Sequence, residues 1–198
     1  MPVNNRVIIK PVYTKALRGP LGRITSGIFN TNLLTNSQSG VVGGYPVNAN
    51  VTFSTNLNIN GITTGLTYGD NSADRFAYKN NHTYEINTRY IFSAFVKMDD
   101  GNPPSFSNSV ISGDFNLILA GTDAVTTGQN FMGNGVWRCW ATYIVGGTPP
   151  GLQNTGVLKR LAHSARTFTC TGYQLEKGVT AMPYIVTGST PVTQEEEA

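Results

Sequence analysis

Short runs of alternating apolar and polar residues, separated by turn-forming residues, recur along most of this chain. In the run from Val51 to Ile59, every second residue is apolar or Thr, and the run ends at Asn60-Gly61, a dipeptide typical of β-hairpin turns. No window keeps the periodicity of an amphipathic helix for three turns. Several strands at short spacing without helices predict an all-β protein, specifically an antiparallel β-sandwich.

Further runs predict the strands that form the core. The longest covers residues 84–98, and others cover residues 114–120, 137–143 and 166–174. Because side chains alternate between the two faces of a strand, each run has one apolar face, and we expect these faces to meet in the core. The residues on these faces are Tyr90, Phe92, Ala94, Val96, Phe115, Leu117, Leu119, Trp137, Cys139, Ala141, Tyr143, Phe168 and Cys170.

The composition is polar but sparsely charged. Charged residues make up 13% of the 198 residues, about half the usual ~25% of globular chains, and 22 Gly, 24 Thr and 20 Asn supply polarity instead. This composition suits strands, turns and an extracellular or virion surface. No apolar run approaches the ~20 residues of a membrane span. The residues after Met1 also lack the apolar segment of a signal peptide. We therefore expect synthesis in a cytoplasm and no membrane partner.

The charges are distributed unevenly along the chain. Residues 1–69 contain five basic residues and no Asp or Glu, whereas the last residues are acidic. We predict a basic N-terminal attachment arm and linker over residues 1–40, a β-sandwich over residues 41–190 and an acidic tail over residues 191–198. A solvated, disordered arm is the alternative. The arm residues expected to contact another subunit are Arg6, Val7, Ile9, Lys10, Lys15, Leu17, Arg18 and Arg23.

Three segments, in this order along the chain, resemble parts of a known domain family. They read Tyr-Ile-Phe-Ser-Ala-Phe-Val-Lys over residues 90–97 and Gly-Val-Trp-Arg-Cys-Trp-Ala-Thr over residues 135–142. The third, residues 172–187, contains Gln-Leu-Glu-Lys-Gly followed by Pro-Tyr-Ile-Val-Thr. Together they resemble the carbohydrate-binding-module-like jelly-roll domain of bacteriophage tail and decoration proteins. Arg138 departs from the pattern, because it follows Trp137 directly instead of one place later.

The resemblance implies a jelly-roll β-sandwich in a virion protein made in the cytoplasm of a bacterial host. We expect a non-enzymatic decoration or cement subunit that docks on the capsid or tail through its arm. The alternative is a short tail or head fibre that binds host glycans. The resemblance also implies a homo-oligomer, most often a trimer, bound to a major capsid or tail protein. No nucleic-acid partner is expected.

Motifs for catalysis and for metal binding are missing from the sequence. His82 and His163 lack the spacing of a zinc site, and neither a phosphate-binding glycine loop nor a nucleophile elbow occurs. We therefore expect no enzymatic activity and no cofactor. The resemblance allows one bound ion, a structural calcium. The Asp99-Asp-Gly-Asn102 turn is rich in oxygen ligands, but it matches a calcium-binding loop poorly and is better interpreted as a surface turn.

Five side chains remain as candidates for binding or for structural chemistry. Trp140 and Arg138 share the strand face opposite Trp137, and we expect them to contact either a neighbouring subunit or a glycan. Cys139 and Cys170 lie on apolar strand faces, which predicts buried, reduced thiols, with a disulfide as the alternative. The carboxylate of Glu176 is expected to accept backbone N–H bonds in the turn that follows.

Overall fold

The computed structural model describes residues 29–34, 51–55, 57–79, 82–107, 112–119, 124–146, 155–187 and 192–195. Within these ranges the protein is all-β and contains no helix. The strands are β1 (Phe29–Asn32), β2 (Val51–Ser54), β3 (Gly65–Tyr68), β4 (Arg75–Lys79), β5 (Arg89–Met98), β6 (Phe106–Ser107), β7 (Phe115–Leu119), β8 (Ala124–Gly133), β9 (Val136–Ile144), β10 (Thr155–Lys159), β11 (Phe168–Lys177) and β12 (Val192–Glu195).

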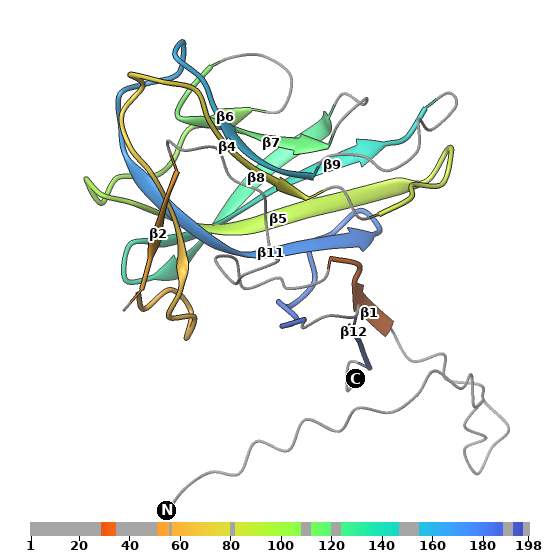
Figure 1. Cartoon of the computed structure of the whole chain (residues 1–198). Coiled ribbons are helices and arrows are strands. Elements are labelled where there is room, and N and C mark those ends of the chain that lie inside the picture. The colour runs from red at the N-terminus through yellow and green to blue at the C-terminus, as the bar shows by residue number, and fades with distance from the viewer. Residues whose placement is uncertain are drawn as a thin grey trace, which may run out of the picture.

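Two sheets pack face to face and form the sandwich (Figure 1). One sheet has the strand order β2-β3-β11-β5-β9-β8, and the other has the order β4-β10-β7-β6. The pairs are antiparallel except for the short parallel pair β6–β7. Neighbouring strands come from distant parts of the chain, as β5 lies between β11 and β9. The predicted antiparallel, jelly-roll-like β-sandwich is confirmed.

The core between the sheets consists of the apolar strand faces that the sequence predicts. On β5 these are Tyr90, Phe92, Ala94 and Val96, all of which are buried. The predicted core residues of β7, β9 and β11 join the same cluster, with Trp137 only partly buried at its margin. Burial of such large side chains is the main favourable term in folding.

The outer face of the six-stranded sheet is also covered. Phe95 on β5 belongs to a second buried cluster with Ile59, Ile62 and Val136, and its ring makes an edge contact with Tyr184, with centroids 5.3 Å apart. The segments before β3 and after β11 therefore cover this face. Alternation alone predicts one buried face for each strand, so it did not show that β5 is buried on both.

Two predicted strands are several residues shorter in the structure. The strand expected over residues 84–98 begins only at Arg89, because Asn87 has a positive φ of 58° and Thr88 closes a turn onto Glu85. The run from Val51 is a strand only as far as Ser54. The hairpin turn predicted at Asn60-Gly61 is confirmed, with φ values of 51° and 79°.

Both cysteines lie in the core between the sheets. Cys139 and Cys170 are buried free thiols. Burial raises the pKa of Cys170 to about 12 and also raises the pKa of Cys139. The prediction of buried, reduced thiols is confirmed over the disulfide alternative.

The first and last described strands pair with each other outside the sandwich. β1 and β12 form a two-stranded antiparallel ribbon next to the end of β11 (Figure 1). Leu34, just after β1, is buried in the main core. Residues 29–34, which the sequence assigns to the arm, are thus packed against the sandwich. Residues 1–28, with all eight predicted docking residues, lie outside the described residues.

Candidate functional site

The predicted contact residue Trp140 lies on the outer face of β9 and is partly exposed. Its neighbour on β8 is Gly128, and a Cβ atom at that position would overlap the indole ring. The absence of a side chain at residue 128 therefore lets the indole lie close against β8. This packing holds an aromatic ring at a fixed place on the sheet surface, a suitable arrangement for stacking on a planar or apolar partner.

Arg138, the second predicted contact residue, is buried, with 7% of its surface exposed. Its guanidinium donates hydrogen bonds to the Ser93 hydroxyl, with Nη2 3.1 Å away, and lies 3.8 Å from the Glu176 carboxylate. It also sits over the Phe95 ring. Burial lowers the pKa of Arg138, and the Glu176 charge opposes that shift. Of the predicted pair, Trp140 offers a surface to a partner, whereas Arg138 is mostly committed to internal contacts.

The Gln-Leu-Glu segment of β11 binds the backbone that follows it. The Gln174 side chain accepts a hydrogen bond from the N–H of Ile185 (2.6 Å) and donates one to the carbonyl of Pro183 (3.0 Å). Glu176 Oε1 accepts the N–H of Met182 (3.3 Å). Glu176 accepts a backbone N–H, as expected, although this donor lies beyond the turn. The role of this segment is to fix residues 182–185 on the outer face of the sheet.

Asn32 fastens the N-terminal side of the sandwich in a similar way. Its amide donates to the carbonyls of Tyr173 (3.1 Å) and Ile185 (2.9 Å). Its carbonyl oxygen accepts the N–H groups of Leu34 (3.1 Å) and Leu175 (3.2 Å). One buried side chain therefore links β1, β11 and the segment after β11.

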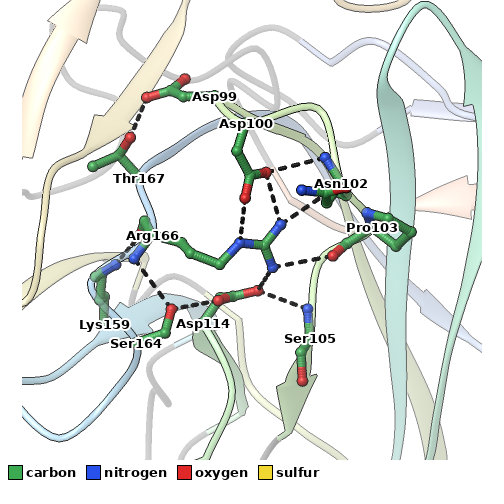
Figure 2. A network of polar contacts seen from close by, with 10 residues as sticks. All are labelled: Asp99, Asp100, Asn102, Pro103, Ser105, Asp114, Lys159, Ser164, Arg166 and Thr167. Carbon is green, nitrogen blue, oxygen red and sulfur yellow. Dashed lines mark hydrogen bonds and ion pairs between the residues drawn. The ribbon is translucent and has the colours of Figure 1, made fainter.

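A polar network centred on Arg166 joins the loops beside β11 (Figure 2). The guanidinium contacts both oxygens of Asp100, each at 2.8 Å, and Asp114 Oδ2 at 2.7 Å. It also donates to the carbonyls of Asn102 and Pro103. The fork of Arg donors matches a carboxylate in this bidentate geometry.

The remaining members of this network make it continuous. Asp114 accepts the N–H of Ser105 (2.7 Å) and the hydroxyl of Ser164. The buried Lys159 donates to the carbonyl of Arg166, and Thr167 donates to Asp99. The network thereby ties three loops, which follow β5, precede β7 and precede β11, to one another.

The charges in this network are matched internally. The hydrogen bond from Arg166 is the main reason that the pKa of Asp100 lies well below its usual range, and the same contact raises the pKa of Arg166. Desolvation lowers the pKa of Lys159. Asp100, part of the turn considered for calcium, is thus bound to a cation of the protein itself. In the described ranges, no group of three or more His, Cys, Asp or Glu side chains could hold a metal ion.

The two histidines have separate structural surroundings. His163 Nδ1 accepts the N–H of Arg160 (2.7 Å), which closes the turn before β11. His82 packs edge-on against the rings of Tyr84 and Tyr90, and burial lowers its pKa. These contacts of the two histidines are therefore to neighbouring backbone or to aromatic rings.

Sequence reasoning did not identify Asn32, Gln174 or Arg166. Asn32 stands in a stretch that reads as linker, and no local pattern distinguishes it from the other asparagines. The Arg166 network joins residues up to 68 positions apart, as in the pair Thr167–Asp99. For Gln174 a signal was available, because it lies in the Gln-Leu-Glu-x-Gly segment. That segment indicated a structural motif but not the hydrogen bonds that its side chains make.

The part of the chain that the structure describes includes no helix long and apolar enough to cross a membrane. No model of a protein family matches this chain, and no curated protein matches it in sequence.

Proposed function

We propose that this protein is a non-enzymatic structural protein of a bacteriophage virion, a decoration or cement-type subunit. Its N-terminal arm docks on the major capsid or tail protein, and its β-sandwich is displayed on the particle. The protein acts as a homo-oligomer, a trimer by the resemblance. The proposal rests on the jelly-roll-like sandwich together with the three sequence segments that resemble phage virion proteins.

The observation that carries the proposal is the way the chain enters the sandwich. The first described strand, β1, pairs with β12 in a ribbon that lies outside both sheets (Figure 1). Asn32 and Leu34 fix that ribbon by buried contacts. A basic arm of 28 residues is therefore attached at one well-defined place, which suits a domain that is tethered by one end.

The contacts of the ionisable side chains support a non-catalytic role. Asp100 and Asp114 bind Arg166, and Glu176 binds Arg138 and the backbone of Met182. Carboxylates held in this way stabilise loops and are not poised for proton transfer to a substrate.

Quantitative mass spectrometry of purified particles tests the proposal. Hundreds of copies per particle are expected for a decoration subunit, and a handful would favour a fibre or tail-tip protein. Deleting residues 1–28 should abolish incorporation into particles while circular dichroism shows an unchanged β-sandwich. Full incorporation of the truncated chain would contradict docking through the arm.

The position of Trp140 favours a second candidate function, a short tail or head fibre that binds host glycans. Its partly exposed ring, held against Gly128, could stack on a sugar. Isothermal titration with surface glycans of the host should then show binding that Trp140→Ala abolishes and Phe53→Ala preserves, since Phe53 is an exposed aromatic residue on another strand. Equal binding by both variants would exclude Trp140 as the glycan contact.

A further inference from the structure

Strand β8 forms one edge of the six-stranded sheet. Among the described residues it pairs with β9 alone, so no described strand occupies its other edge. Between two register irregularities at its ends, Thr126 to Phe131 pair regularly with β9. This leaves a continuously paired stretch of six residues, enough for a short strand to add alongside.

This edge lacks the usual protection against strand addition. Proteins block exposed edges with Lys, other charges or Pro, and residues 124–133 contain none of these. Apolar surface is exposed at the same place, because Phe131 is 59% exposed and Met132 is 45% exposed. By contrast, β2 at the opposite edge is only four residues long.

We infer that the β8 edge is the docking site for residues 6–10 of the arm of a second copy of this chain, added as a further strand. The inference rests on the proposed homo-oligomer and names the contact that joins its copies. Residues 6–10 read Arg-Val-Ile-Ile-Lys, three consecutive β-branched residues between two basic ones. Such residues favour strands, and side chains on both faces of the added strand would cover the apolar residues at the end of β8.

The length of the arm permits this exchange. Residues 11–28 connect the docking segment to β1 and can span at most about 60 Å when extended. A domain of this size has a radius of gyration of about 15 Å, so the segment can reach across a neighbouring copy. Each copy then gives one arm and receives one, a head-to-tail contact that closes into a ring such as a trimer.

The test uses the full chain and two pairs of matched variants. Thr127→Lys adds a charge at an exposed position of β8, and Thr52→Lys adds the same charge on the opposite edge strand, β2. Ile8→Asp disrupts the docking segment, and Ala16→Asp changes the arm outside it. Sedimentation velocity should show an oligomer for wild type, Thr52→Lys and Ala16→Asp. Thr127→Lys and Ile8→Asp should weaken association by at least tenfold, with far-ultraviolet circular dichroism unchanged.

Cross-linking identifies the chain that supplies the arm. A full-length chain with Ile8→Cys is mixed with a full-length chain with Thr127→Cys, and the mixture is treated with a short bismaleimide. The native Cys139 and Cys170 are buried and therefore shielded from this reagent. A linked pair at twice the chain mass is expected. An internal link in the double variant, without linked pairs, would show that each arm folds back on its own sandwich and would overturn the inference.

The remaining outcomes separate this inference from the proposed function. If Ile8→Asp prevents association and Thr127→Lys does not, the arm docks elsewhere, so the β8 site is wrong and the arm still docks. A wild-type chain that is monomeric but still enters particles through its arm would overturn the arm exchange between copies. It would leave the proposed docking of the arm on particles intact. If Ile8→Asp leaves both association and incorporation into particles unchanged, the inference fails, and arm docking through this segment fails with it.

Discussion

A single buried amide, that of Asn32, saturates its hydrogen-bonding capacity with four backbone groups. Asn32→Ala would remove one hydrogen-bond partner from each of these buried groups, and losing one partner of a buried hydrogen bond costs more than the bond contributes net. We expect a loss of about 2–4 kcal/mol in the free energy of unfolding. Urea titration followed by tryptophan fluorescence measures it.

The exposed Asn58 provides the control for this substitution. Asn58→Ala should change the free energy of unfolding by less than about 0.5 kcal/mol. Equal effects of the two substitutions would show that the Asn32 contacts contribute little.

The thiols of Cys139 and Cys170 should be unreactive in the folded protein. Both are buried, and burial raises the pKa of each, to about 12 for Cys170, so very little thiolate is present at pH 8. Treatment with iodoacetamide at pH 8 should label neither thiol in the native protein and both in 6 M guanidinium. Rapid labelling of the native protein would contradict their placement in the core.

At the scale of the strands, β11 depends on a bulge at Gly172. The register with β5 shifts between Thr171 and Gln174, and Gly172 has a φ of 62°. A Cβ atom there would overlap the Phe95 ring. We expect Gly172→Ala to destabilise the fold by about 1–3 kcal/mol through backbone strain and displacement of that ring. Thermal unfolding followed by circular dichroism measures the loss.

The same substitution at Gly146 is the matched control, because a Cβ atom there meets no atom within 4 Å. Gly146→Ala should leave the midpoint of thermal unfolding nearly unchanged. A similar loss at both sites would mean that the bulge tolerates a side chain.

The loops around Arg166 should respond to acid. The folded pKa of Asp100 is depressed, chiefly by its hydrogen bond from Arg166. The resulting stabilisation is complete above the unfolded pKa of about 3.9 and is lost as the pH falls from there toward the folded value. Wild type should therefore exceed Asp100→Asn in stability at pH 7, and the difference should shrink below about pH 4. Urea midpoints measured from pH 7 to pH 3 test this, and a constant difference would argue against the ion pair.

The alternation of apolar residues predicted β2, β5, β7, β9 and β11 and the core faces of the last four, but it did not identify β3, β4, β8 or β10. Phe115, Leu117 and Leu119 of β7 face the core as expected, because an inward face must be apolar wherever it meets a second sheet. The candidate contacts were harder to predict. Arg138 sits on the face expected to contact a partner, but the segment after β11 covers its part of that face, and no local pattern encodes where a distant segment folds. Long-range polar networks are missed for the same reason.

For the whole molecule, we expect a trimer in solution. The arm carries apolar residues but has too few to form a core of its own, so another subunit must cover them, and closed symmetry is the usual way. Light scattering coupled to size-exclusion chromatography should give a mass three times the 21.3 kDa of the chain. A stable monomer over the micromolar range would contradict it.

The way β1 joins the sandwich has a mechanical consequence. A pull on the chain through residue 28 first meets the short β1–β12 ribbon, which can peel away, and then reaches Asn32 and Leu34. There the bonds to Tyr173, Leu175 and Ile185 must break together, because one side chain and the adjacent backbone make them. A force on the arm would therefore separate the β1–β12 ribbon first. The contacts of Asn32 with β11 would carry the remaining force, and the strands of the core would stay in register.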